Sequence, residues 1–275
     1  MQPLTLQECQ QEALKVLIKF DEICKKNNFK YFLIYGTLLG AIRHNGFIPW
    51  DDDLDVMMPR EDFDNFIRYA NDNAKELLPF KLCDRSNTED YWYGIPRFSN
   101  LEFKYMNEHS YEKAFDLGTF IDIYPLDNYG SNFKDAENLW KKFQRINRMF
   151  SWYINSESPR GLIVTMIKSF LHLYMKIIKG AKYEKKIEDE IREAVLKNTS
   201  EKDVYVGLLV WASKVVLYEK AKLQDLETID HLFEGHMFPI PKCYDYMLKQ
   251  SYGDYMKLPP EEERNPYHGY NIYRR

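Results

Sequence analysis

The sequence places four carboxylates directly before an apolar run. Asp51, Asp52, Asp53 and Asp55 fall within five positions, and Val56, Met57 and Met58 follow. Like charges repel one another, and the apolar run is expected to be buried. Such an arrangement is unfavourable unless a cation lies among the carboxylates or they stay in water. This segment therefore predicts either a cation site or an acidic, solvated turn at the start of a buried strand.

The alternation from Asp53 onward has the period of a strand. Asp53 and Asp55 would point to the same face, with their Cα atoms about 6.5 to 7 Å apart, so both carboxylates could reach one ion. Hard carboxylate oxygens favour Mg²⁺ or Mn²⁺ over zinc. The alternative is an acidic turn leading into an ordinary strand, with Asp51 and Asp52 capping or solvated.

A Gly-Thr turn lies close by in the sequence. Residues Tyr31–Tyr35 are aromatic or branched and predict a buried strand, which Gly36 ends. Leu38–His44 has the pattern of a short helix. Thr37 and neighbouring backbone N–H groups would then lie where they can hold a phosphate.

A third carboxylate, Asp122, lies in the otherwise apolar segment Thr119–Pro125. A charge in such a strand needs a partner, and a metal shared with Asp53 and Asp55 is one solution. Pairing with a buried arginine, or a place on an exposed edge, is the other. Asp127 follows Pro125 and is expected in a loop, outside the metal shell.

Five segments together resemble a known family, the LicD family of phosphocholine transferases. They are Tyr35–His44, Gly46–Asp55, Met58–Phe63, Phe120–Asp127 and Tyr252–Pro260. The resemblance spans nearly the whole chain, and the first two segments are long enough to be specific. Fukutin-related sugar-phosphate transferases share the same core.

The resemblance implies a nucleotidyltransferase-like fold with Asp53, Asp55 and Asp122 as catalytic metal ligands. It also implies transfer of phosphocholine from CDP-choline to a sugar hydroxyl of a cell-surface glycan precursor, of teichoic acid or lipopolysaccharide type, with release of CMP. The precursor is expected to be lipid-linked. One alternative is a nucleotidyltransferase that acts on a small molecule or sugar phosphate and releases pyrophosphate. A non-catalytic glycan- or membrane-binding protein is another.

Several side chains are candidates for binding substrate. Arg43 ranks first among the arginines for phosphate because it lies inside the family segment; Arg97 and Arg60 are the others, and Arg60 has acidic neighbours to pair with. His44 is a candidate base or a helix cap. Aromatic faces hold trimethylammonium groups. The aromatic candidates are Trp50, Tyr91, Trp92 and Tyr93, with Tyr267, His268, Tyr270 and Tyr273 in the tail.

The overall pattern predicts an α+β fold. A nucleotidyltransferase-like mixed β-sheet core is expected over residues 1–130. Residues 131–275 are expected to form a mainly helical region that completes the substrate site, with breaks near Pro159 and at Pro239–Pro241. In the first part, Thr5 and Glu8 have capping-box spacing for a helix to about Lys26.

Charge is concentrated in one stretch of the chain. Residues 141–182 contain nine basic residues and one acidic residue, Glu157. Within this stretch, apolar positions between Ile163 and Ile178 recur at three- and four-residue steps, which predicts an amphipathic helix. Core packing is the reading we favour for its apolar face; contact of residues 160–182 with an anionic membrane is the alternative. No nucleic-acid reader motif is found, and the overall charge of −4 disfavours that partner.

The cysteines and the start of the chain bear on its compartment. Cys9, Cys24, Cys83 and Cys243 lack the spacing of a zinc site or a disulfide framework. The first residues, from Met1, show no basic and apolar leader. The sequence therefore predicts a cytoplasmic protein, with a peripheral location at the inner face of the membrane as the alternative.

Overall fold

The structure is a computed structural model that describes residues 2–88, 91, 93–107, 116–154, 162–179, 193, 204–208, 215–265 and 270–275. The elements of its first half are α1 (Leu6–Asn27), β1 (Phe32–Leu33), α2 (Tyr35–His44), β2 (Asp55–Pro59), α3 (Arg60–Asp72), β3 (Phe80–Cys83), β4 (Arg97–Asn100), β5 (Phe103–Asn107) and β6 (Thr119–Asn128). The second half contains α4 (Phe133–Ile154), α5 (Leu162–Lys179), β7 (Tyr205–Leu208), β8 (Val216–Glu219), β9 (Thr228–Phe233), β10 (His236–Pro241), α7 (Tyr244–Tyr252) and β11 (Tyr270–Arg274). The predicted α+β class is confirmed.

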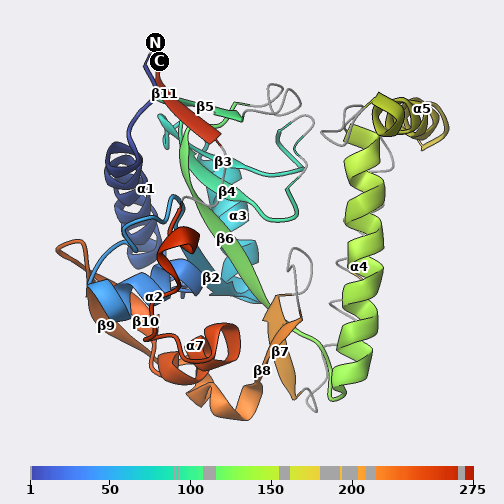
Figure 1. Cartoon of the computed structure of the whole chain (residues 1–275). Coiled ribbons are helices and arrows are strands. Elements are labelled where there is room, and N and C mark those ends of the chain that lie inside the picture. Colours follow the sequence, from blue (N-terminus) through green and yellow to red (C-terminus); the bar gives the residue numbers. More distant parts are fainter. Residues whose placement is uncertain are drawn as a thin grey trace.

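A mixed sheet organises the molecule (Figure 1). Its strand order is β1-β2-β6-β4-β3, and β7 and β8 extend it from the far end of β6. The β2–β6 pair is parallel, whereas β6 runs antiparallel to β4 and to β7. The long strand β6 therefore joins the amino-terminal strands to strands from the second half of the chain.

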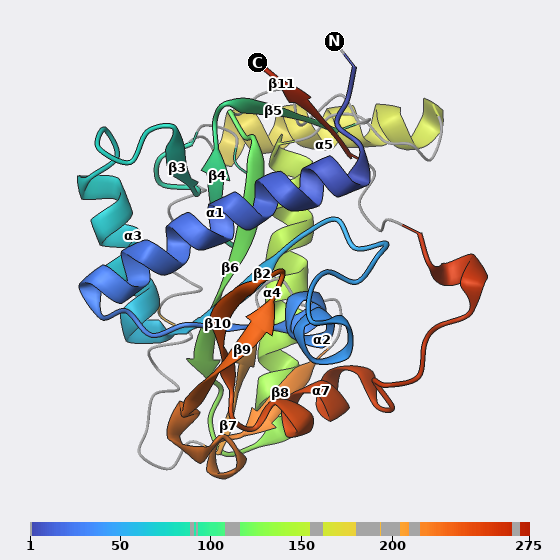
Figure 2. The ribbon, with the colours of Figure 1, turned by 90° about the vertical axis from the view of Figure 1, so that its left-hand side faces the viewer.

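Helices α1 and α3 cover one face of this sheet, and Figure 2 shows α1 crossing in front of β6. The aromatic ring of Phe20 in α1 lies 4.8 Å from that of Phe66 in α3 and 6.4 Å from that of Phe98 in β4. Because successive strand residues face opposite sides, Ile121 and Ile123 of β6 enter this core. Their neighbour Asp122 must face the opposite side.

The structure confirms the predicted first helix. Thr5 caps α1, its side chain accepting a hydrogen bond from the Glu8 backbone while the Glu8 carboxylate accepts one from the Thr5 backbone. The apolar face of the helix that this box starts carries Phe20 into the core. A capping box and an apolar stripe are local signals, so the sequence alone locates this helix.

The second half departs from the expectation of a mainly helical region, since its described part also contains five strands. Pro239–Pro241 was expected to separate two helices. It lies instead in β10, which pairs antiparallel with β9. Strand β11 pairs with β5, and the Leu4 backbone N–H donates to the Ile272 carbonyl at 2.8 Å. These strands depend on distant partners, which periodicity within one segment does not reveal.

Candidate active site

Three carboxylates converge where the two parallel strands begin. Asp55 and Asp122 are register partners across β2 and β6, and Asp53 comes from the turn that enters β2. One oxygen from each of these three residues lies within 4.8 Å of the others. Asp53 and Asp55 therefore converge as predicted, although Asp53 precedes the strand. Their role as ligands of an ion stays a prediction.

Asp55 has an unusual environment for a carboxylate. Its Oδ1 atom is buried and has no hydrogen-bond partner within the described residues. Burial raises the pKa of Asp55 well above its ordinary value, the Asp53, Asp122 and Asp51 carboxylates raise it further, and a hydrogen bond with Tyr124 acts in the opposite direction. A buried, unsatisfied oxygen among like charges is the environment that a hard divalent cation would stabilise. The residues thus fit Mg²⁺ or Mn²⁺.

Asp122 has an arginine partner as well as these carboxylate neighbours. The Arg97 Nε atom donates to Asp122 Oδ1 at 2.7 Å, and both side chains are buried. The Arg97 guanidinium carbon lies 3.6 Å from the ring centroid of Tyr93 and 4.0 Å from that of Phe120. A shared metal and a buried arginine partner were the two alternatives for Asp122, and they do not exclude each other. One Asp122 oxygen pairs with Arg97, and the same carboxylate lies next to Asp53 and Asp55.

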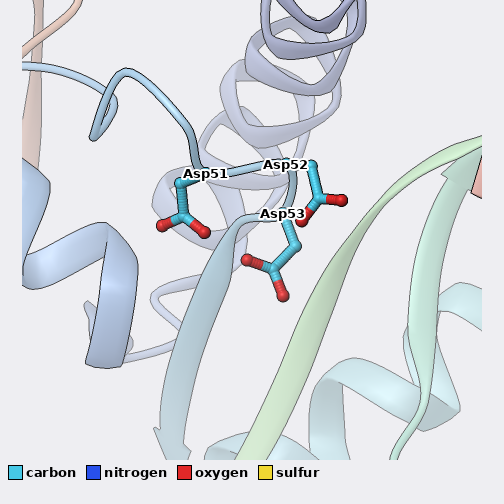
Figure 3. A group of neighbouring side chains, drawn as sticks. All are labelled: Asp51, Asp52 and Asp53. Atoms are coloured by element: carbon cyan, nitrogen blue, oxygen red, sulfur yellow. The ribbon is translucent and has the colours of Figure 1, made fainter. Parts of the chain in front are cut away.

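The acidic turn itself is shown in Figure 3. Asp51, Asp52 and Asp53 follow one another along it, and Asp53 points between the ribbons of β2 and β6. These three residues also bring one oxygen each within 4.8 Å of the others. The turn is fastened from the carboxyl-terminal strand, where the Tyr270 hydroxyl donates to the Asp52 carbonyl. Asp52 is buried, which disagrees with a fully solvated turn.

The Gly-Thr pair lies in the first turn of α2, not after a five-residue strand, because β1 is short and the helix begins at Tyr35. The Thr37 hydroxyl accepts the Asp55 backbone N–H at 2.7 Å. A Cβ atom on Gly36 would lie 2.6 Å from Asp51 Oδ2, so a larger residue at this position would displace the Asp51 side chain. Both residues thus position the acidic segment; binding of phosphate by them stays a prediction.

A cleft of about 760 Å³ adjoins the acidic turn. Its walls come from α2, from residues 48–51 and from the segment after α7; they are Gly36, Leu39, Arg43, Ile48, Trp50, Asp51, Tyr252, Asp254, Tyr255, Lys257, Leu258, Pro259, Pro260, Glu263 and Asn265. The cleft therefore combines aromatic rings with both cationic and acidic side chains. A charged ligand with an organic part would find suitable contacts here.

Two predicted binding residues, Arg43 and Trp50, line this cleft. Arg43 Nη1 donates to the Tyr255 carbonyl at 2.9 Å, and its Nε donates to His44 Nε2 at 3.0 Å. The Arg264 guanidinium carbon lies 5.6 Å from the Trp50 ring centroid. Burial, and then the charge of Arg43, lower the pKa of His44. Neutral His44 accepts the hydrogen bond from Arg43 through Nε2. This nitrogen could act as a base only after that hydrogen bond is broken.

Arg60 and Asp127 correct two expectations. Asp127 lies in β6 and not in a loop, and Arg60 pairs with it through Nε and Nη2, each 2.6 Å from a carboxylate oxygen. Arg60 also contacts Asp64 at 3.2 Å. The sequence predicted that Arg60 would pair with its neighbours Glu61 and Asp62, but its partners are Asp127 and Asp64. The strand continues through Pro125 because β2 and β7 both pair with it, and neither partner is visible from the local sequence.

The remaining aromatic candidates divide between core and site. Tyr91 and Tyr93 are buried in a core cluster, and Trp92 lies outside the described residues. Tyr267 and His268 also fall outside them. Tyr270 packs against Tyr105 with ring centroids 4.8 Å apart and reaches the acidic turn, as described above. Tyr273 faces Lys104 across the β11–β5 pair.

Two tyrosines near the carboxylates escaped the sequence analysis. Tyr124 hydrogen-bonds to Asp55, and its ring lies 5.2 Å from that of Tyr35. The alternation of β6 could have found it, because Tyr124 must share a face with Asp122. Tyr252 lines the cleft with 44% of its surface exposed, and the charges of Asp55 and Asp51 act on its hydroxyl group. Nothing in the local sequence around Tyr252 indicates its approach to the acidic turn, which depends on the packing of α7 on α2.

Comparisons with known proteins find related sequences. The family described as LicD/FKTN/FKRP, nucleotidyltransferase domain, matches residues 28–166, which include the three converging carboxylates. The chain is 30% identical to the lipopolysaccharide cholinephosphotransferase LicD of Haemophilus influenzae, over 99% of each protein. It is also 56% identical to an uncharacterized protein of Rickettsia typhi, over 52% of each.

Proposed function

This chain belongs to the LicD family, and from that membership we propose that it is a cholinephosphotransferase acting on lipopolysaccharide or a related cell-surface glycan precursor. Its relationship to a named cholinephosphotransferase identifies it as a phosphotransferase. We further propose that the donor is CDP-choline, that the acceptor is a sugar hydroxyl, and that CMP is released. The core would be a nucleotidyltransferase-like fold, and the site would face the cytoplasm.

One observation supports the metal dependence that we propose. Asp53, Asp55 and Asp122 lie within reach of one ion, and the Oδ1 atom of Asp55 is buried without a partner. These residues would hold Mg²⁺ or Mn²⁺. When bound, such an ion offsets negative charge on the diphosphate and favours ionisation of the attacking hydroxyl.

The protein's own residues would orient the substrates. The cleft beside Asp51 would take the donor, with Trp50 and Glu263 on its walls as an aromatic face and an acid for the trimethylammonium group. Arg43 and Lys257 line the same cleft and would attract the diphosphate. Arg97, buried against Asp122, would hold that carboxylate in place and would not contact substrate directly.

The experiment that tests this function is identification of the released nucleotide. The purified protein is incubated with CDP-choline, Mg²⁺ and a lipopolysaccharide acceptor, and the products are separated by chromatography. We expect CMP together with choline-modified acceptor, and loss of both when EDTA replaces Mg²⁺. Pyrophosphate released from a nucleoside triphosphate, without CMP from CDP-choline, would favour the nucleotidyltransferase. No turnover with either donor would favour the non-catalytic protein.

A further inference from the structure

Helix α5 exposes an unusually apolar surface. Eight of its large apolar side chains are exposed: Ile163, Val164, Met166, Ile167, Phe170, Leu173, Tyr174 and Ile177. Phe170 is 69% exposed, and Ile163 and Ile177 exceed 70%. They recur at three- and four-residue steps, so they form one continuous stripe along the helix. A stripe of this kind normally faces the core; this one faces outward, contrary to the core packing we favoured from the sequence.

The shielded side of α5 is the more polar one. Its half-buried positions are Thr165, Lys168, Ser169, Leu171 and His172. Burial lowers the pKa of Lys168, and the Nδ1 atom of His172 is buried without a hydrogen-bond partner in the described part of the chain. The helix is thus oriented with polar groups toward the protein and apolar groups away from it. In water alone this orientation is unfavourable, which indicates that something covers the outer face.

The charge of the surrounding segments indicates what that cover is. Residues 141–154 and 162–179 contain no acidic residue, and their basic residues are Lys141, Lys142, Arg145, Arg148, Lys168, Lys176 and Lys179. Arg145 and Arg148 are exposed on α4. Nearer its start, α4 also carries Asp135 and Glu137, and Glu137 pairs with Lys141 at 3.0 Å. An apolar stripe whose neighbouring charges are mainly basic matches an anionic lipid surface, where headgroups attract the cations and acyl chains accept the apolar side chains.

The arrangement of the two helices suits contact with a flat surface. Helix α4 runs along one side of the sheet, and α5 lies crosswise at its end, away from β2 and α2 (Figure 1). Figure 2 shows α5 lengthwise at the level where β6 begins, at the opposite end from its arrowhead. No helix among the described residues is long and apolar enough to cross a membrane. A helix lying along the surface is the remaining way for α5 to bury its stripe in lipid.

We propose that α5 is a membrane-surface helix that rests on an anionic bilayer through the stripe from Ile163 to Ile177. This proposal is independent of the reaction proposed above. A second copy of this chain is the competing occupant of the stripe, but lysines and arginines are not matched by like-charged residues in a self-complementary contact.

The test is flotation of the full-length protein with lipid vesicles. The vesicles contain phosphatidylcholine alone or with phosphatidylglycerol. We expect the wild-type protein to float with the anionic vesicles and to bind less at high salt. The triple variant Ile167→Glu, Phe170→Glu and Ile177→Glu should lose at least about tenfold in binding, because binding scales with buried apolar area. Since all three side chains are exposed, circular dichroism should remain that of the wild type.

A matched control separates apolar contact from charge. The variant Ile229→Glu, Leu232→Glu and Met237→Glu makes the same change at three exposed side chains of the β9–β10 hairpin. It should float as the wild type does. Equal loss in both variants, or no binding of the wild-type protein to anionic vesicles, would overturn the proposal. A wild-type dimer that the α5 variant converts to monomer, without vesicle binding, would assign the stripe to a second copy instead.

Discussion

Asp55 and Asp122 stand directly opposite each other on the parallel strands β2 and β6. Both side chains are buried, and both point away from the core that contains Ile121 and Ile123. The sheet register therefore fixes two carboxylates side by side, and the turn adds Asp53. The backbone pairing holds these carboxylates together, so a bound cation or uptake of a proton must offset the repulsion among them.

Replacement of Asp55 by asparagine should separate activity from stability. Removing the carboxylate should lower kcat by at least about 10³-fold if Asp55 holds the metal, since the asparagine oxygen carries no charge for the ion. The same change removes like-charge repulsion, so the metal-free protein should gain about 1 kcal/mol, or roughly 2–4 °C in Tm. Steady-state CMP release and calorimetry in EDTA measure the two effects.

The matched control for this change is Asp72→Asn. Asp72 is the last residue of α3 and is exposed, and it is not among the carboxylates that converge at the site. Both its rate and its Tm should stay near those of the wild type. An Asp55→Asn protein that retains near-normal turnover would show that Asp55 is not a metal ligand.

The pH dependence of metal-free stability should report the raised pKa of Asp55. Burial and the neighbouring carboxylates raise this pKa above the ordinary 3.8, so the folded state holds a proton that the unfolded chain has released. Below about pH 4, Asp55 is protonated in both states and does not reduce the free energy of unfolding. That free energy should fall as the pH rises toward the pKa of Asp55 in the folded state. The Tm of wild type minus that of Asp55→Asn, followed in EDTA from about pH 4 to 8, should decrease. A flat difference would contradict the shift.

The Arg97–Asp122 pair should behave as a buried, coupled ion pair. Arg97→Met leaves the Asp122 charge without its partner in a buried site, which should cost about 3–5 kcal/mol in urea unfolding. Adding Asp122→Asn should recover part of that loss, giving a coupling energy above about 1 kcal/mol. Arg68→Met, on the exposed side of α3, should change stability by under about 0.5 kcal/mol. Additive effects of the two changes would argue against the pair.

Two substitutions of Thr37 test the hydrogen bond that its hydroxyl accepts from the Asp55 backbone. Thr37→Val keeps the shape but removes the acceptor, leaving a buried N–H unsatisfied at a cost of about 1–3 kcal/mol. Thr37→Ser keeps the hydroxyl and should lose much less. Urea unfolding of the two variants compares them, and CMP release shows whether displacement of Asp55 also lowers kcat. Equal stability of the two would mean that the hydroxyl does not carry this contact.

Trp50 tests the proposed place of the choline group. Trp50→Ala removes an aromatic wall of the cleft and should raise KM for CDP-choline by roughly 2- to 30-fold, the range expected for a cation–π contact. Trp50→Phe retains an aromatic face and should lie between the alanine variant and the wild type. An unchanged KM in Trp50→Ala would place the choline group elsewhere. Initial rates at varied CDP-choline concentration provide the measurement.

Local signals in the sequence located the beginning of the fold and the carboxylates of the candidate site. Alternation placed Asp122 in a strand, and the capping box of Thr5 placed the start of α1. The run of carboxylates directly before an apolar segment predicted a cation, and this prediction did not require the strand order. Each of these arguments needs only a few consecutive residues and the physical cost of burying a charge.

Long-range pairing explains what the sequence did not reveal. Asp127 lies in β6 because strands from both halves of the chain pair with it, and Pro239 lies in β10 because β9 supplies a partner. The outward orientation of α5 was also hidden, since periodicity shows that a helix has an apolar face but not what that face meets. Such contacts join segments distant in sequence, so no window of neighbouring residues contains them.

The hydrogen bond between Tyr270 and the Asp52 carbonyl has a consequence for biosynthesis. It joins positions 218 residues apart, the later one in the carboxyl-terminal strand β11. A nascent chain exposes its amino-terminal parts first. The acidic turn therefore leaves the ribosome long before the tyrosine that fastens it, and a ribosome-bound intermediate carries these carboxylates on a turn that has yet to be anchored.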